Sequence, residues 1–282
     1  MQIQAAHAAA LTSGRRQPKT NGLKGLAAQT VKHHHRVLSQ ALKQAVRLGL
    51  IARNPAERVD PPRPARTEMK ILVPAQTAAL LAAAEHSFVY VPIVLAVATG
   101  ARRGEVPGLR WADVDLERAT ASIAQTLEET DRAGLAFKPP KTERSRRLLA
   151  LPPVAIDLLR HHRAPRAEER LQARRDWIDN GLVCRDALGR PLTPRRVSKA
   201  FLQVRRKLGL AVRFHDLRHG YASILLAQDT HPKVVQEALG HASVSITLDV
   251  YSHLIPGMQQ EAANRIDTVL RTHLERGQPK NG

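Results

Sequence analysis

A proline-rich stretch divides this chain into two parts. Four prolines fall between residues 55 and 64, and the run Val59-Asp60-Pro61-Pro62-Arg63-Pro64 is too rich in proline for a helix or a central strand, because proline lacks a backbone N–H and has a fixed φ. Such a run favours an extended linker. At 282 residues the chain is long enough for two modest domains. We therefore predict a small domain over residues 1–62, which includes the linker, and a larger domain over residues 63–282.

Apolar periodicity predicts a mainly helical protein. Residues 1–27 show no period and are expected to form a loose tail, whereas Gln29 to Leu48 has the spacing of one amphipathic helix that Gly49 ends. In the larger domain the pattern predicts helices over 73–84, 89–98, 153–175, 195–208, 215–228, 232–239 and 258–272. Short strand-like runs at 120–126, 135–138 and 146–151 predict one small antiparallel sheet. The expected class is α+β, mainly α with a small antiparallel β-sheet.

The charge balance indicates a polyanionic partner. The formal net charge is +19, from 44 Lys and Arg against 25 Asp and Glu. The sequence has no apolar run of about 18 residues that could span a bilayer. This favours nucleic acid over a membrane as the partner, and a soluble, cytoplasmic protein is expected. With 3% aromatic residues, base stacking on single strands is disfavoured and double-stranded DNA fits better. A single cysteine, Cys184, offers neither a disulfide nor a metal-ligand spacing.

One helical segment carries a candidate phosphate site. In Phe214-His215-Asp216-Leu217-Arg218-His219, His215 and Arg218 are three residues apart, so a helix places both on one face. An arginine fork binds phosphate oxygens and an imidazole moves protons near neutral pH. A solvated charged face explains the spacing equally well. A zinc pair formed by His215 and His219 is disfavoured, because Asp216 stands where a zinc protease carries glutamate and Arg218 adds a cation.

Three further segments are weak signals when taken singly. Arg102 lies in Thr99-Gly100-Ala101-Arg102, a turn that leads into a predicted helix. Lys141 opens a basic run between two predicted strands, where most such runs are solvated surface. Leu239-Gly240-His241 precedes Tyr251, whose phenol, with a pKa of about 10, is a poor nucleophile unless cations stabilise the phenolate. A lone tyrosine in such a place more often belongs to a core or an interface.

In their order along the chain, these segments resemble the signature of the tyrosine site-specific recombinases of the phage integrase family. The pattern is T-G-x-R, a β-hairpin lysine, H-x-L-R, L-G-H, and a tyrosine ten residues after that last histidine. The resemblance runs from about Val73 to Leu270. Residues 29–55 resemble the end of the family's core-binding domain, and the larger domain resembles its catalytic domain.

The resemblance implies a set of phosphate-binding residues. Arg102 and Arg218 resemble the arginine pair that clamps the scissile phosphate, and His241 resembles the histidine that contacts it. The resemblance implies no metal, no nucleotide cofactor and no small-molecule substrate. The implied partner is double-stranded DNA, bound by a homotetramer.

The remaining roles concern the nucleophile and the protons. Tyr251 resembles the nucleophile, His215 its general base or proton relay, and Lys141 the acid that protonates the 5′ oxygen. The implied reaction breaks and rejoins DNA by transesterification through a 3′-phosphotyrosine. The helix predicted over 258–272 is a candidate for packing on a neighbouring protomer, and packing on its own domain explains it equally well.

Two departures from the family pattern keep alternatives open. Pro107 falls inside the helix expected to begin near Arg102, where an interior proline costs about 3 kcal/mol and displaces the backbone. Residues 1–60 also supply about half of the helices of a core-binding domain, so a truncated domain is expected. The alternatives are a non-catalytic DNA-binding integrase remnant and a topoisomerase of the tyrosine type, which shares this chemistry but relaxes a single duplex.

Overall fold

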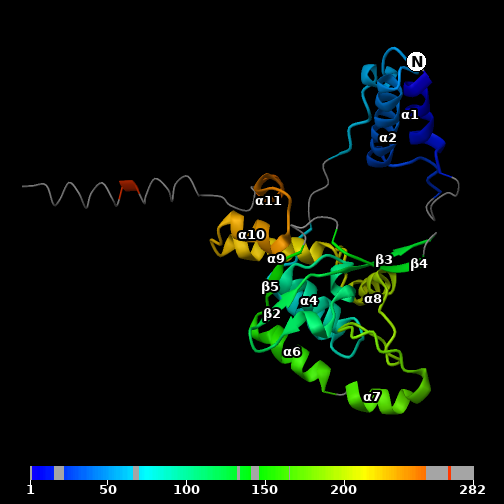
Figure 1. Ribbon diagram of the computed structural model, residues 1–282. Helices are drawn as coiled ribbons and strands as arrows, with labels where there is room; N and C mark the ends of the chain where they lie inside the picture. Colours follow the sequence, from blue (N-terminus) through cyan, green and yellow to red (C-terminus); the bar gives the residue numbers. More distant parts are fainter. Residues whose placement is uncertain are drawn as a thin grey trace, which may run out of the picture. The chain divides into compact units, whose positions relative to one another are not determined.

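The computed structural model describes residues 2–15, 22–65, 70–131, 134–140, 146–164, 166–251 and 266–267, and of residues 166, 167, 246 and 249–251 it describes the backbone alone. The chain divides into two compact units, Met1–Glu68 and Met69–Gly282 (Figure 1). Each is considered by itself. The assignment of the first as a truncated core-binding domain stays a prediction.

The first unit is a pair of helices, α1 (Gln2–Ser13) and α2 (Ala28–Arg47), followed by the 3-10 turn η1 (Pro55–Arg58). The helix predicted over 29–48 is confirmed by α2. The expectation of a loose tail over 1–27 is wrong for α1. Its five alanines make this segment a good helix former without any apolar period, and the ring of His7 packs edge-on against His35 of α2, with 5.2 Å between centroids.

In its described residues the second unit is mainly helical, and its helices surround a buried central helix, α4. Seven of the ten residues of α4 are buried, and it packs against α3, α5, α6 and α9. In sequence order the helices are α3 (Pro74–Ala84), α4 (Tyr90–Thr99), α5 (Glu105–Gly108), η2 (Trp111–Asp113), α6 (Pro153–Arg163), α7 (Arg166–Ala173), η4 (Arg174–Asp176), α8 (Pro194–Lys207), α9 (Asp216–Ala227), α10 (Pro232–Leu239) and α11 (Val244–Tyr251).

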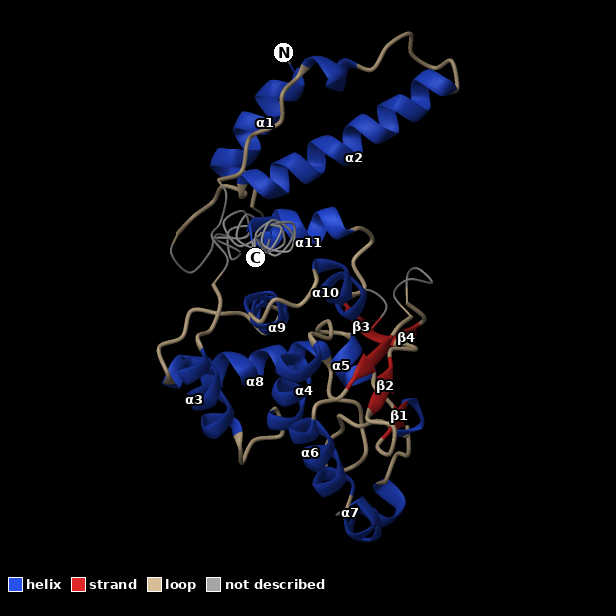
Figure 2. Ribbon diagram, turned by 90° about the vertical axis from the view of Figure 1, so that its left-hand side faces the viewer, coloured by secondary structure: helices blue, strands red, loops and turns tan. Residues whose placement is uncertain are grey.

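Among the described residues, the strands form two small antiparallel sheets rather than the single sheet expected. One has the order β1 (Val114–Asp115), β2 (Thr120–Ser122) and β5 (Leu148–Ala150), and the other is a hairpin of β3 (Thr126–Thr130) and β4 (Gly134–Lys138) (Figure 2). In the hairpin, Leu127 is opposite Phe137. The chain crosses from β2 to β3 within a few residues, which is why the sequence pattern merges the two strands. The mainly helical class with small antiparallel sheets is confirmed.

Two predicted helices differ from the observed elements. The helix expected over 153–175 is two, α6 and α7, because α6 ends at Arg163 and the sequence has Pro165, before which a helical backbone is disfavoured. The helix expected over 258–272 lies outside the described residues apart from 266–267. Helix α11 was not predicted as a helix.

The concern about Pro107 is also resolved by the local structure. Helix α5 is a single turn, and Pro107 is its third residue. The N–H groups of a first turn have no acceptor within the helix, so proline removes no helical hydrogen bond there. The helix expected to run on from Arg102 does not exist, and no kink arises.

As for membrane association, none of the helices within the described ranges has the length and apolarity to cross a bilayer.

Candidate active site

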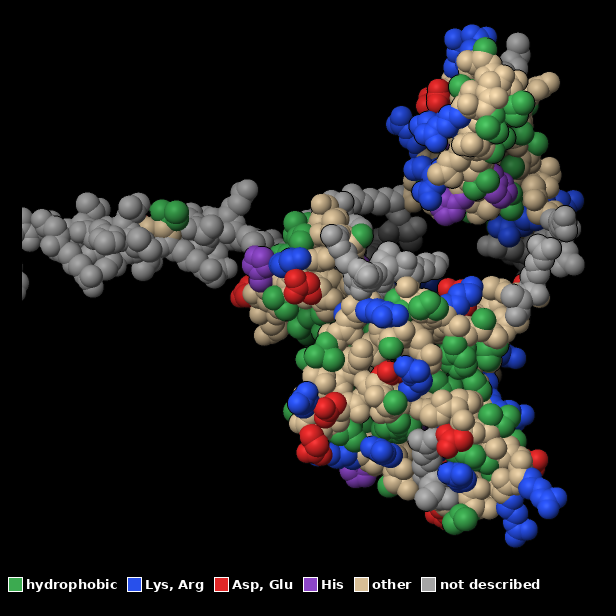
Figure 3. Space-filling model, viewed as in Figure 1, with side chains coloured by type: hydrophobic (Ala, Val, Ile, Leu, Met, Phe, Trp, Pro, Cys, Tyr) green, Lys and Arg blue, Asp and Glu red, His purple; other side chains and the backbone are tan. Residues whose placement is uncertain are grey.

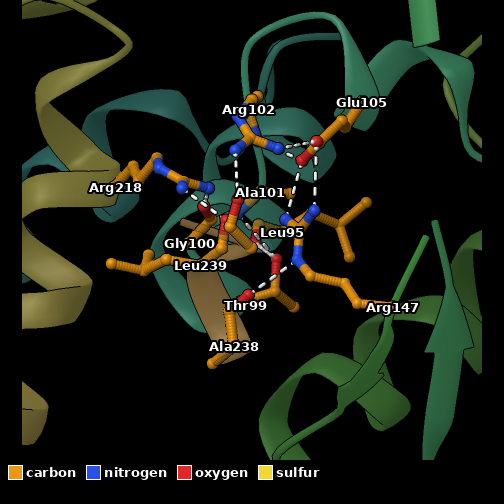
Figure 4. A network of polar contacts seen from close by, with 11 residues as sticks. Leu95, Thr99, Gly100, Ala101, Arg102, Glu105, Arg147, Arg218, Ala238 and Leu239 are labelled. Atoms are coloured by element: carbon orange, nitrogen blue, oxygen red, sulfur yellow. Dashed lines mark hydrogen bonds and ion pairs between the residues drawn. The ribbon is translucent and has the colours of Figure 1, made fainter. Parts of the chain in front are cut away.

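Three successive backbone carbonyls at the end of α10 each accept a hydrogen bond from a different arginine. Ala238 O accepts from Arg147 Nε at 2.7 Å, Leu239 O from Arg218 Nη2 at 2.5 Å, and Gly240 O from Arg102 Nη2 at 2.7 Å (Figure 4). The last carbonyls of a helix have no partner within it and carry its negative dipole end. The end of α10 therefore gathers three guanidinium groups from distant parts of the chain.

Arg102 is held by the turn between α4 and α5. Gly100 ends α4 in the left-handed conformation, with φ of 63°. Glu105, at the start of α5, accepts from the backbone N–H of Arg102 and from its Nη1, both at 2.7 Å. Burial alone would raise the pKa of Glu105, but hydrogen bonds and positive charge from Arg147 and Arg102 lower it to about 2. The carboxylate is therefore ionised at neutral pH, and the Arg102 side chain retains 36% exposure.

Arg218 lies in the first turn of α9 and is 3% exposed. Besides Leu239 O, it donates through Nη1 to Gly100 O at 2.7 Å. It thus joins the end of α4, which leads to Arg102, to the end of α10, which leads to His241. Of the two arginines, Arg102 is the more accessible to a ligand.

His241 follows Gly240, which ends α10 with a left-handed φ of 61° and turns the chain back. The imidazole Nδ1 lies 2.9 Å from Thr247 Oγ1 of α11, and the backbone oxygen of His241 accepts from Gln236 Nε2 at 2.5 Å. Burial, and then the positive charges of Arg218 and Arg102, lower the pKa of His241 to about 4. The imidazole is accordingly neutral at pH 7.

His215 is the residue directly before α9. Burial, the neighbouring His219 and then Arg218 lower its pKa to about 4, although Asp216 acts in the opposite direction. The rings of His215 and His219 meet edge-on, with 5.4 Å between centroids. Within the ranges that the structure describes, no three His, Cys, Asp or Glu side chains are grouped as metal ligands.

An open cleft of about 590 Å³ lies beside these groups. Arg102, Arg103 and His215 line it together with residues of β3 and with Pro140. The cleft therefore brings one phosphate-clamp candidate and one proton-transfer candidate to the same surface. Lys141 is the next residue after Pro140 in the sequence, but it lies outside the described residues.

Tyr251 is the last residue of α11, and only its backbone is described. Helix α11 is attached to α10 through the contact of His241 with Thr247, whose side chain is fully buried. The structure thus brings together Arg102, Arg218 and His241, with His215 on the adjoining cleft. It does not describe where the Tyr251 hydroxyl or the Lys141 amine lies.

Arg147 belongs to this cluster but was not predicted as a member of it. It lies in the basic run that Lys141 opens, where most such residues are solvated surface. In the structure Arg147 Nη2 lies 2.8 Å from Glu105 Oε2, and its side chain is 6% exposed. The one signal in the sequence is its place directly before the apolar strand residues Leu148 and Leu149, where a basic residue at a strand start can point inward.

Known recombinases and integrases are similar to this chain in sequence. A tyrosine recombinase XerC-like protein of Caldanaerobacter subterraneus subsp. tengcongensis is 28% identical over 263 residues, and an integrase of Streptomyces ambofaciens is 30% identical over 258 residues. Both alignments cover 87% of this chain, but 66% and 65% of those two proteins. The matched part is therefore slightly less than two thirds of either relative.

Solved structures share the fold. The Tn1549 transposon integrase in complex with a circular intermediate DNA superposes with a TM-score of 0.73 at 21% identity, over 86% of this chain and 81% of that one. A lambda integrase tetramer bound to a Holliday junction gives a TM-score of 0.51 at 21% identity, over 76% of this chain and 57% of the other.

A model of the phage integrase family matches residues 70–257. That span is well over half of the chain, and it contains the arginine cluster at the end of α10, the cleft with His215, and α11. The protein belongs to the phage integrase family.

Proposed function

We propose that this protein is a site-specific DNA recombinase that breaks and rejoins DNA through a 3′-phosphotyrosine at Tyr251. The observation that carries the proposal is the convergence of Arg102, Arg218 and His241 at the C-terminal end of α10. Contacts between residues as many as 138 positions apart place two guanidinium groups and an imidazole in one cluster. Phosphoryl transfer relies mainly on positioning and on electrostatic stabilisation of charged oxygens, which such a cluster supplies.

In the proposed reaction, Arg102 and Arg218 bind the non-bridging oxygens of the scissile phosphate, and His241 contacts the same phosphate. The Tyr251 oxygen attacks phosphorus, and its proton passes to His215. The bond from phosphorus to the 5′ oxygen breaks, and Lys141 gives that oxygen a proton, which yields a free 5′ hydroxyl. Attack by a 5′ hydroxyl of a partner duplex on the phosphotyrosine reverses these steps and joins new strands.

The protonation states support this division of roles. The pKa values of about 4 leave His215 and His241 neutral at pH 7 without DNA. A neutral His215 can accept the phenol proton, which a protonated imidazole cannot. A bound phosphate brings negative charge that raises both pKa values again, so either ring becomes a better proton acceptor when the substrate is present.

Covalent trapping tests the proposal. The protein is incubated with a pool of duplexes that carry a nick and randomised flanking sequence. Cleavage near the nick releases a short fragment, and its loss prevents rejoining. We expect a DNA adduct that survives denaturation, and a DNA-linked peptide containing Tyr251. Tyr251→Phe should bind the same DNA without forming an adduct. Binding by the wild-type protein without any adduct would favour the non-catalytic remnant.

A second assay separates recombination from relaxation. Duplexes recovered from the trapped pool are supplied in pairs, and recombinant products are sought. Relaxation of supercoiled DNA at unrelated sequences, without recombinants, would favour a topoisomerase instead.

We also propose that the active species is a homotetramer on double-stranded DNA, since exchange between two duplexes requires four cleavages. The lambda integrase tetramer, which shares the fold, supports this stoichiometry. Mass measurement of the protein with and without trapped DNA should give four copies for each pair of duplexes. A stable monomer or dimer throughout recombination would contradict it.

A further inference from the structure

Arg147 contacts both of the segments that carry the proposed phosphate-binding groups. Its Nη1 and Nη2 donate to Glu105 Oε1 and Oε2 at 3.1 and 2.8 Å, and its Nε donates to Ala238 O at 2.7 Å (Figure 4). Glu105 in turn holds Arg102. Ala238 lies three residues before His241. A single guanidinium therefore joins the Arg102 turn to the end of α10.

The position of Arg147 is fixed by the sheet. Its backbone oxygen accepts from the N–H of Ile123 at 2.9 Å, which extends the pairing of β2 with β5 by one residue. Its side chain is 6% exposed, whereas that of Arg102 is 36% exposed. Arg147 is thus anchored at the backbone and shielded from solvent, which suits a group that acts on protein neighbours.

We propose that Arg147 is a positioning residue for strand cleavage, and this rests on the proposed recombinase function. It fixes the direction of the Arg102 guanidinium through Glu105, and it fixes the position of the segment that carries His241 through Ala238 O. Both contacts are needed, because Arg102 and His241 come from different elements and must meet one phosphate. A bidentate pair with a carboxylate sets an orientation as well as a distance.

Loss of Arg147 should uncouple these elements. Glu105 would keep Arg102 as its remaining contact in this cluster, and the α10 end would lose one of its three guanidinium donors. Misplacement of a reacting group by about 1 Å can lower a rate about 100-fold. We therefore expect Arg147→Met to lower the cleavage rate constant about 10- to 100-fold, while the Kd for DNA changes less than about 3-fold.

The experiment compares variants in single-turnover cleavage of a nicked duplex from the trapped pool. Arg147→Lys should recover part of the rate, since an ammonium group can reach one of the two partners. The matched control is Arg185→Met. Like Arg147, Arg185 is 6% exposed and pairs with a glutamate, Glu169. Arg185 lies over the ring of Trp177, which comes after α7 in the sequence. In Figures 1 and 2, α7 is at the far end of the second unit from α10. The control should cleave at the wild-type rate.

A merely structural role for Arg147 is distinguished by a second substrate. A methylphosphonate at the scissile position lacks one negative charge and depends less on Arg102, so the loss of rate with Arg147→Met should be at least about 10-fold smaller than on the phosphodiester. Equal losses on both substrates would mean fewer active molecules and would overturn the proposal.

If Arg147→Met does not fold, the double variant Glu105→Gln with Arg147→Met also removes the charge of the buried carboxylate that has lost one of its two arginine partners. It should fold and show the same selective loss on the phosphodiester. Unchanged cleavage by either folded variant, beside an active wild type, would refute the positioning role. An inactive wild type would instead refute the proposed function.

Discussion

The pKa of His241 is lowered by burial and then by the positive charge gathered at the end of α10. Its pKa in the folded protein is about 4, against 6.5 for an ordinary histidine. Between pH 6.5 and 4 the unfolded chain binds a proton that the folded protein does not, so the free energy of unfolding falls as the pH falls through this range. Below about pH 4 both states are protonated and the dependence ends. Above about pH 6.5 the imidazole is neutral in both states, and the free energy of unfolding no longer depends on its titration.

This sign leads to a test with His241→Asn, whose amide can still contact Thr247 Oγ1 but does not titrate. From pH 7.5 to 5.0 the wild-type protein should lose on the order of 1–2 kcal/mol of stability through His241, since one pKa unit is about 1.4 kcal/mol, only the part of the window between pH 6.5 and 5.0 is titrated, and solvent screens a half-buried ring. The variant should lose less, although His215 still contributes with the same sign. Chemical unfolding at both pH values measures it. An identical loss in variant and wild type would contradict the assignment.

Gly100 is a second single residue on which the site depends. Its φ of +63° is left-handed, and a Cβ there would lie 2.5 Å from the Tyr221 ring. We expect Gly100→Ala to destabilise the protein by about 2 kcal/mol or more, from backbone strain and overpacking together. Cleavage should fall as well, because Gly100 O is an acceptor of Arg218.

Gly209 provides the matched comparison. It has a φ of +64° with no atom within 4 Å of an added Cβ. Gly209→Ala should therefore cost about 1 kcal/mol from the backbone alone, with cleavage unchanged. Denaturant unfolding and trapping of both variants measure the difference. Equal destabilisation by the two substitutions would show that the Tyr221 ring yields freely.

At this scale the sequence identifies residues but not their contacts. Arg102, Arg218 and His241 follow from their order along the chain. Their partners are backbone carbonyls, which are present at every residue and leave no mark in a sequence pattern. The contact of Arg147 with Ala238 spans 91 positions. It exists because the sheet and α10 pack beside each other.

Among the elements, those with both an apolar period and a terminal signal are predicted well. Helix α8, expected over 195–208, begins at Pro194, and Thr193 Oγ1 caps it by accepting from the N–H of Arg196 at 3.1 Å. Helix α1 has neither signal and is stabilised by packing on α2. Strand β1 is missed, and the run predicted over 120–126 reaches only the first residue of β3, because these two strands depend on pairing with β2 and β4 rather than on a clear alternation of their own.

Helix α5 supports a prediction about Pro107. If this proline interrupted a longer helix, Pro107→Ala would stabilise the protein by about 3 kcal/mol. In a single-turn helix no such gain is available, and the buried ring would lose apolar contacts. We expect a destabilisation of about 1 kcal/mol and unchanged DNA cleavage. Chemical unfolding measures the sign, and a stabilised variant would show that the longer helix forms.

At the scale of the whole molecule, the net charge of +19 is spread over surfaces that also carry acidic and apolar side chains (Figure 3). Helix α8 is the clearest local concentration. Its apolar residues, such as Val197, Phe201 and Val204, are buried, whereas Lys199 and Arg206 are exposed on another face. A helix with one buried face and one basic face is suited to contact phosphates along a duplex.

The final prediction concerns the salt dependence of binding to the trapped duplex. Each phosphate that a cation neutralises adds about −0.9 to the slope of log K against log salt. Lys199→Gln with Arg206→Gln should therefore make the slope shallower by about 2. The control, Arg118→Gln with Arg160→Gln, removes equal charge from residues paired with Asp115 and Glu117 at 3.8 Å. Its slope should stay unchanged if contacts act locally, whereas equal changes in both variants would mean that net charge alone attracts DNA.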